Sequence, residues 1–156
     1  MTPSTTSAGR SARESLQHII DVLEGIPQTL LAIPLRLAIA TVFWNSAMTK
    51  LDDWTAALAL FSDEYQVPLL PPDIAAYMAV SIELSMPVLL VLGLFTRLAA
   101  TVLLGMTLFI EIFVYPQAWP THIQWAAMML VLICRGGGAL SVDHLLAGRF
   151  GLRPTR

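Results

Sequence analysis

The sequence predicts an all-α protein: a four-helix transmembrane bundle with both termini in the cytoplasm, preceded by an amphipathic surface helix. Three observations predict this fold. Hydrophobic residues make up 56% of the 156 residues and charged residues only 13%, about half the charged fraction of an average soluble domain. Several apolar runs are long enough to cross a bilayer. The basic residues, moreover, fall almost entirely on one side of such a bundle.

The composition and the positions of the reactive residues exclude several classes of function. The net charge is −2 and the sequence contains no basic cluster, so we expect no binding to nucleic acid. The single cysteine, Cys134, excludes an internal disulfide and a CxxC redox pair. His122 and His144 fall at opposite ends of the predicted bundle, which excludes a bis-histidine haem site. The HExxH, GxSxG and P-loop motifs are absent from the sequence, and we expect no metal site.

The first part of the chain is predicted to precede the membrane domain. Residues 1–13 are small and polar, which predicts a disordered tail. The apolar core of a cleavable signal peptide does not follow the arginines of this tail directly, so we do not expect one. Residues 14–27 have the periodicity of an amphipathic helix, which either lies on the membrane surface or covers the end of the bundle. The apolar residues of this helix share one face: Leu16, Ile19, Ile20, Leu23 and Ile26.

Residues 30–146 are predicted to form the membrane domain. Its first span begins at Leu30 or Pro34, and Pro34 is either the first helical residue or the position of a kink. Residues 52–72 are expected to lie outside the cell and to contain a short helix over residues 54–65. The first three spans end at Ala47, Phe95 and Tyr115, the second and third being Ile74–Phe95 and Leu98–Tyr115.

The fourth span is the shortest, and the charge distribution indicates that it crosses. Ile123–Cys134 alone would reach only ~18 Å, whereas Trp119–Arg135 reaches ~24 Å, enough with slight thinning of the bilayer. If this segment crosses, Lys50 is the single basic residue outside. Residues 147–156 then form a basic cytoplasmic tail, and both termini are cytoplasmic by the positive-inside rule. The basic residues on the cytoplasmic side are Arg10, Arg13, Arg97, Arg135, Arg149, Arg153 and Arg156.

Glu83 is the residue of the predicted bundle that costs most to bury, because it is the sole charged side chain in the span Ile74–Phe95. A charged side chain at the centre of a bilayer costs ~2.5–3.5 kcal/mol or more. Pro87 lies four residues later and leaves the Glu83 carbonyl without its helical partner, so we expect a kink there. Glu83 is therefore expected either to form a buried pair that fixes helix packing or to serve as a ligand or proton site.

Polar residues on the outer half of the bundle form a candidate intramembrane pocket. Asn45 is a candidate hydrogen-bond partner for either intramembrane glutamate, and Lys50 is long enough to reach down from the rim. Glu111 lies nearer the outer boundary than Glu83 and either faces the same cavity or reaches the outer interface. The sequence assigns no catalytic residue. The candidate pocket comprises Glu83, Glu111, Asn45, Lys50 and His122.

Arg36 begins the first span near the cytoplasmic boundary and has two interpretations. Its side chain either extends into the cytoplasmic interface or forms an ion pair with Asp143, which follows the fourth span on the same side. A pair with Glu83 is disfavoured. Side chains lean toward the N-terminus of their helix, so two antiparallel helices direct Arg36 and Glu83 apart.

Five motifs occur in a defined order along the chain. Arg36 begins the first span, which ends in FWNSAMTKL, and the outer loop contains FSDEYQVP. Glu83 in the second span is followed by LGLFTR, and GGGALSVDHLL follows the fourth span. In order and spacing these motifs resemble the DoxX family of small bacterial four-helix membrane proteins, over roughly residues 34–146. The chain departs from the family at Gly136–Gly138, where Gly-Pro-Gly is frequent, without unsettling the predicted fold.

The resemblance implies a location and a class of partner. It implies a multi-pass protein of the bacterial cytoplasmic (inner) membrane, surrounded by lipid. Some members of the family are subunits of membrane oxidoreductases, including thiosulfate:quinone oxidoreductase, and others associate with oxidative-stress proteins. We therefore expect an accessory or anchor subunit of a redox system rather than a catalyst on its own, with a membrane or soluble oxidoreductase as partner. A quinone is the candidate cofactor that the resemblance suggests, and the sequence itself identifies no cofactor.

Two other functions remain open at this point. A small proton-coupled transporter or exporter component would use Glu83 and Glu111 as protonatable groups. A structural assembly factor would need no ligand at all. A homo-oligomer also remains open, since small residues permit close helix contacts either within or between chains. These residues are Ala99, Ala100, Gly105, Ala126 and Ala127.

Overall fold

The computed structural model describes residues 7–149, with side chains from residue 13 onward, and this part of the chain is entirely helical apart from turns. The predicted all-α class is confirmed. The elements in chain order are α1 (Ser7–Glu24), α2 (Gln28–Asp52), α3 (Trp54–Ala59), the π-helix η1 (Leu60–Tyr65), α4 (Pro72–Leu92), α5 (Thr96–Phe113), the 3₁₀ turn η2 (Pro116–Ala118), α6 (Trp119–Arg135) and α7 (Val142–Arg149).

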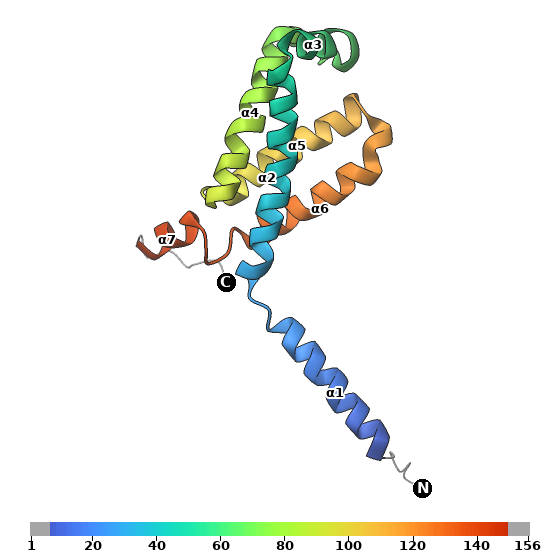
Figure 1. Ribbon diagram of the computed structural model, residues 1–156, viewed down its shortest axis with the longest axis vertical. Helices are drawn as coiled ribbons and strands as arrows, with labels where there is room; N and C mark the ends of the chain where they lie inside the picture. Colours follow the sequence, from blue (N-terminus) through green and yellow to red (C-terminus); the bar gives the residue numbers. More distant parts are fainter. Residues whose placement is uncertain (1–6, 150–156) are drawn as a thin grey trace.

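Two antiparallel helix pairs form the bundle. Helix α2 packs along α4, and α5 packs along α6 (Figure 1). The two pairs contact each other through α4 with α5 and through α2 with α6, and they diverge toward one end (Figure 1). We call this end, where α2 leads into α3, the outer end, and the end where α2 begins the inner end. The buried core between the pairs includes Ile39, Phe43, Leu90, Leu103, Met129 and Leu132.

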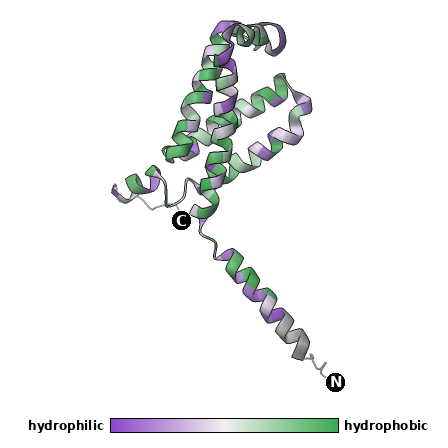
Figure 2. Ribbon diagram, viewed as in Figure 1, coloured by the Kyte–Doolittle hydropathy of each residue, from purple (hydrophilic) through white to green (hydrophobic). Residues whose placement is uncertain are grey.

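Three helices of the described chain are long and apolar enough to cross a membrane: α2, α4 and α5. Figure 2 shows many hydrophobic residues, in green, along these helices. Helix α6 has only 17 residues, which correspond to ~24 Å of rise, so by length and composition it is not among the three. The chain is therefore a helical membrane protein with three candidate spanning helices, and its fourth helix matches the longer of the two ranges that the sequence predicted.

Close packing of small residues occurs within the chain. Ala99, Ala100 and Ala126 are buried where α5 meets its neighbours, so these three serve contacts inside the bundle. Gly105, in contrast, lies in open space: a Cβ atom built on it would have no neighbouring atom within 4 Å. Gly105 therefore marks a gap in the packing.

Helix α1 starts earlier than the sequence predicts. It begins at Ser7, so residues 7–13 are helical rather than part of a disordered tail, and residues 1–6 of that predicted tail lie outside the described residues. Residues 14–24 continue the same helix, as predicted, and Leu16, Ile19 and Leu23 are exposed along it. Figure 1 shows α1 extending away from the bundle. The bundle therefore leaves the apolar face of α1 uncovered.

The outer loop contains the predicted short helix. The Asp53 carboxylate caps α3 by accepting a hydrogen bond of 2.9 Å from the Ala56 backbone N–H. The π-helix η1 continues from α3, and its Phe61 packs against Ala75 and Ala76 at the start of α4. This contact places η1 over the outer end of α4.

The turn between α4 and α5 is closed by the segment that follows α6. Gly93 has a left-handed backbone conformation (φ +67°), and a Cβ atom built on it would lie 2.6 Å from the Ser141 Cβ and 2.8 Å from an Arg36 nitrogen. Asp143 accepts hydrogen bonds from the backbone N–H groups of Phe95 and Thr96, at 2.7 and 2.8 Å. Its carboxylate thereby caps the beginning of α5.

Two glycine substitutions test this packing. We expect Gly93→Ala to lower the free energy of unfolding by on the order of 2 kcal/mol or more. The new Cβ atom would clash with Arg36 and Ser141, and alanine is strained in a left-handed backbone conformation. Gly105→Ala should leave the stability unchanged or raise it by up to ~1 kcal/mol, because the space is open and alanine suits a helix better. Unfolding in detergent, followed by circular dichroism, measures both. Equal stabilities of the two variants would contradict this account of the turn.

Candidate functional site

A buried ion pair joins α2 to α4. The Lys50 ammonium lies 2.9 Å from both carboxylate oxygens of Glu83 and 2.7 Å from the Ser46 hydroxyl oxygen. Ser46 in turn donates a hydrogen bond of 3.1 Å to Glu83 Oε1. The side chains of Lys50 and Glu83 are only 10% and 3% exposed. The structure therefore places Lys50 against Glu83, in an ion pair that joins α2 to α4.

The same ion pair lies in the wall of a cavity of about 350 Å³ between α4 and α5. The polar atoms are concentrated at Ser46, Lys50 and Glu83, and most of the remaining lining is apolar. The residues of η1 and of the loop after it complete the wall near the outer end. The main apolar lining residues are Phe61, Val67, Leu70, Met78, Ile82, Met106, Phe109 and Ile110.

Gly105 of α5 and Tyr65 of η1 both line this cavity. Gly105 leaves room in the α5 wall because no atom lies where its side chain would be. Tyr65 comes from η1, outside the helices expected to span. Burial raises the pKa of its phenol, with smaller contributions in the same direction from the carboxylates of Glu83 and Glu64 and a smaller opposing one from Tyr115. Tyr65 therefore keeps its hydroxyl proton and remains a hydrogen-bond donor at neutral pH.

Tyr115 ties the outer loop to the end of α5. Its hydroxyl donates a hydrogen bond to a Glu64 carboxylate oxygen, and its ring packs edge-on against Tyr65 with centroids 5.6 Å apart. Burial raises the pKa of the Tyr115 phenol, and its hydrogen bond to Glu64 acts in the same direction. Through these contacts η1 is held above the cavity from both α4 and α5.

Glu111 and His122 form a second buried pair, separate from the first. His122 Nδ1 lies 2.6 Å from Glu111 Oε2, and the two side chains are 9% and 11% exposed. The His122 ring also contacts Trp125, with centroids 5.2 Å apart. This pair joins α5 to α6, whereas Glu83 joins α4 to α2. The cavity is lined by Glu83 and not by Glu111 or His122.

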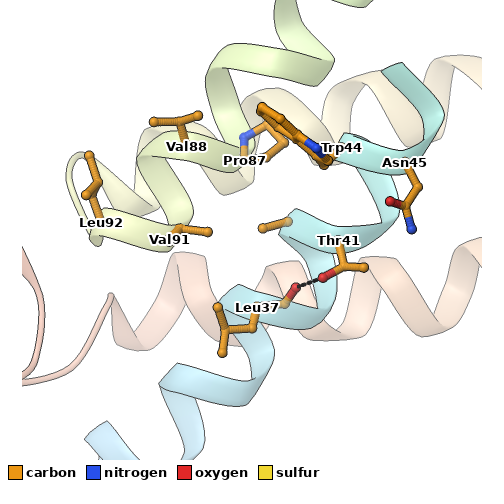
Figure 3. A pocket seen from close by; sticks show the side chains of 9 residues that line it. Leu37, Thr41, Trp44, Asn45, Pro87, Val88, Val91 and Leu92 are labelled. Carbon is orange, nitrogen blue, oxygen red and sulfur yellow. Dashed lines mark hydrogen bonds between the residues drawn. The ribbon is translucent and has the colours of Figure 1, made fainter. Parts of the chain in front are cut away.

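Asn45 lies on another face of α2. It is exposed and lines a groove of about 290 Å³ between α2 and α4, together with Trp44 and Pro87 (Figure 3). The structure gives the Asn45 side chain no contact with Glu83 or Glu111, so its predicted role as their hydrogen-bond partner is not seen. The five predicted residues therefore separate into the pair Lys50–Glu83, the pair Glu111–His122, and Asn45 alone.

Arg36 and Asp143 do not form the direct ion pair that the sequence suggested. The Arg36 guanidinium donates to four backbone carbonyls: Leu90 at 2.6 Å, Val91 at 2.5 Å, Leu140 at 2.9 Å and Gly137 at 3.1 Å. Asp143 instead caps α5. Among the described residues no Arg36–Asp143 contact within 4 Å is formed. Backbone carbonyls accept from Arg36 and backbone N–H groups donate to Asp143. Such backbone partners do not depend on residue type, so the sequence does not reveal them.

Of the residues that line the cavity, the sequence-predicted pocket contained only Lys50 and Glu83, and three of the others determine its polar end or its open wall. Ser46 was identifiable, since it precedes Lys50 by four residues and therefore shares its helical face. Gly105 was identified as a small residue for helix contacts, although it instead leaves a wall open. Tyr65 had no signal, because a π-helix places it and no periodicity in the sequence predicts one.

The energetic role of the ion pair is open to test by a double-mutant cycle. We expect Glu83→Gln and Lys50→Met each to lower the free energy of unfolding by on the order of 3 kcal/mol, because each leaves a buried polar or charged partner. The double variant should be more stable than the sum of the single losses predicts. Asp52→Asn, at an exposed position of the same helix, is the control and should change nothing. Additive losses would mean that the two side chains are not coupled.

Comparisons with known proteins place the chain in a family. The family model named DoxX matches residues 31–116, more than half of the chain. A protein of Haemophilus influenzae, described as uncharacterized, is 28% identical over 139 residues, which cover 80% of this chain and 88% of that protein. No solved structure matches the chain. The extent of the family match, over α2 to α5 and the buried Lys50–Glu83 pair, shows that this chain belongs to the DoxX family.

Proposed function

We propose that the protein is an accessory subunit of a quinone-linked redox system in the bacterial cytoplasmic membrane, and that it binds the quinone head group in the cavity beside Lys50 and Glu83. The catalytic oxidoreductase is then a partner protein. The observation that carries the proposal is a largely apolar cavity with one polar end, built around a buried ion pair. A few convergent polar groups in an apolar pocket are typical of small-molecule sites.

The chemistry of a quinone suits this arrangement. A quinone has two carbonyl oxygens that accept hydrogen bonds and an apolar tail, and its quinol has two hydroxyls that also donate. Tyr65 offers a donor and the Glu83 carboxylate offers acceptors, whereas Lys50 and Ser46 already donate to Glu83. The apolar walls of α4 and α5 would hold the ring and the beginning of the tail. The role of this chain in the proposal is to bind and orient the ligand for its partner.

The proposed topology has four crossings and both termini in the cytoplasm. The contacts at the inner end support it, although α6 is short. The segment after α6 touches the α4–α5 turn, where the Asp143 backbone N–H donates 2.9 Å to the Gly93 carbonyl. Helix α5 leaves this turn and α6 leads back to it, so the two helices run between the same ends of the bundle. With seven basic residues at the inner end or in the flanking tails, this end is the cytoplasmic one.

Cysteine labelling tests the topology. Leu69 is fully exposed in the outer loop, and Gly148 has open space around its Cβ position at the end of α7. In a Cys134→Ser background, we expect Leu69→Cys to react with a membrane-impermeant maleimide in intact spheroplasts. Gly148→Cys should react only after the membrane is permeabilised. Labelling of both positions in intact spheroplasts would place them on one side, which is the result for three crossings.

Quinone binding is tested with the purified full chain in detergent and decylubiquinone as the probe. We expect saturable quenching of tryptophan fluorescence in the wild type. Gly105→Leu should weaken this binding by roughly tenfold or more, because the new side chain fills space that the ligand would occupy. A tenfold loss of affinity corresponds to ~1.4 kcal/mol of lost binding free energy. Gly148→Leu, at an open position far from the cavity, should bind as the wild type does.

Two results would reject the quinone site. The first is the absence of saturable quenching in a folded wild type. The second is equal affinity in the wild type and Gly105→Leu, which would place the binding elsewhere. Glu83→Gln adds a test of the polar end and should weaken the binding, provided that its unfolding curve shows a folded protein under the assay conditions.

A further inference from the structure

A second, larger cavity lies at the inner end of the bundle, on the opposite side from the ion pair. Its volume is about 580 Å³, and it is formed where the connection between α1 and α2 passes the end of α6. It shares no lining residue with the cavity between α4 and α5. It is lined by Leu23, Glu24, Ile26, Gln28, Leu31, Leu130, Val131, Cys134 and Arg135.

Three polar groups around this cavity have no partner in the part of the chain that the structure describes. Nε2 of Gln28 is buried and donates no hydrogen bond. Arg135 ends α6 as an exposed cation, and neither of the two ion pairs among residues 13–149 includes it or Glu24. A buried amide donor without an acceptor is costly, on the order of 1–3 kcal/mol. The cavity is therefore lined by residues that carry an unpaired amide donor, a cation and an anion.

The rest of the lining is apolar and exposed. Leu31 of α2 is 48% exposed, and Leu130 and Val131 of α6 are 50% and 40% exposed. Leu31 follows Gln28 along α2, and Leu130 and Val131 precede Arg135 along α6, so all three lie farther into the bundle than these two polar residues. Leu23 extends the apolar surface onto the last turn of α1. The cavity thus has an apolar part along the bundle and a polar rim at its end.

We infer that this cavity binds one phospholipid with an ethanolamine head group. Arg135 and the Gln28 amide would donate to the phosphate oxygens, and the Glu24 carboxylate would accept from the ammonium group. The acyl chains would then lie along Leu31, Leu130 and Val131. The order of the charges follows the lipid: Arg135 ends a bundle helix, whereas Glu24 ends α1, which extends away from the bundle (Figure 1).

The charge pattern selects this ligand over related ones. An inorganic phosphate or an anionic head group would meet the Glu24 carboxylate without a compensating cation, which is unfavourable. A single apolar chain would leave Arg135 and Gln28 unpaired. A head group that carries phosphate and ammonium satisfies both ends of the rim. Guanidinium–phosphate contacts are also charge-assisted and strong.

Native mass spectrometry of the purified full chain provides the test. After reconstitution with equal amounts of phosphatidylethanolamine and phosphatidylglycerol of the same acyl chains, we expect one retained lipid per chain, enriched for the ethanolamine form. Arg135→Gln should reduce the retention by roughly tenfold, the effect of losing one charge-assisted hydrogen bond. Arg149→Gln removes a charge near the same end but outside the cavity, and it should retain lipid as the wild type does.

Cys134 supplies an independent readout, since it is exposed and lines the cavity. We expect phosphatidylethanolamine to slow its reaction with a small maleimide in the wild type and less so in Arg135→Gln. Glycerophosphoethanolamine, which has the head group without acyl chains, should give no protection at the same concentration. Equal protection by it would make the site one for a soluble phosphodiester and would overturn the lipid assignment.

The selectivity for ethanolamine has its own variant. Glu24→Gln should abolish the preference for phosphatidylethanolamine over phosphatidylglycerol while leaving total retention within about twofold, because only the ammonium contact is lost. Equal retention of the two lipids by the wild type, or equal retention by wild type and Arg135→Gln, would overturn the proposal. The absence of any retained lipid would overturn it as well.

Discussion

The inner end of the bundle depends on the Arg36 guanidinium. It donates to four carbonyls, two from the last turn of α4 and two from the segment after α6. The last carbonyls of a helix lack the regular partners of its interior. The Leu90 carbonyl accepts from the Gly93 N–H at 3.1 Å as well as from Arg36, and the Val91 carbonyl accepts from Arg36. A guanidinium offers five donors in one rigid plane, which an ammonium cannot match. One side chain of α2 therefore holds the end of α4 and the chain beyond α6 in a fixed relation.

The direction of side chains on antiparallel helices explains why the two cations of α2 have different partners. Side chains lean toward the N-terminus of their helix, so those of α2 lean inward and those of α4 lean outward. Lys50 begins at the outer end and leans inward, and Glu83 leans outward to meet it at 2.9 Å. Arg36 already lies at the inner end, so it leans away from Glu83 and reaches the carbonyls there. The same rule pairs one cation with a carboxylate and the other with the backbone.

This rule also marks how far the sequence could predict the site. Hydropathy and charge were enough for the helical membrane class, and side-chain direction was enough to separate Arg36 from Glu83 and to bring Lys50 within reach. The sequence could not assign Arg36 to backbone carbonyls, because acceptors of this kind depend on where helices end and not on residue type. It also could not separate Glu83 from Glu111. Both were candidates for one outer cavity, whereas the structure places Glu83 between α4 and α2 and Glu111 between α5 and α6, in helix pairs that diverge at the outer end (Figure 1).

The contacts of the ion pair bear on the form of the ligand that the proposed quinone cavity would accept. The three N–H donors of Lys50 are already directed to Glu83 Oε1, Glu83 Oε2 and Ser46 Oγ. A quinone carbonyl only accepts, so it would bind Lys50 at the expense of one of these bonds. A quinol hydroxyl can donate to a Glu83 oxygen that has a lone pair to spare, and the ion pair then stays intact. The buried pair is therefore complementary to a donor, and within the proposed function it favours the reduced, hydroxyl-bearing form of the ligand.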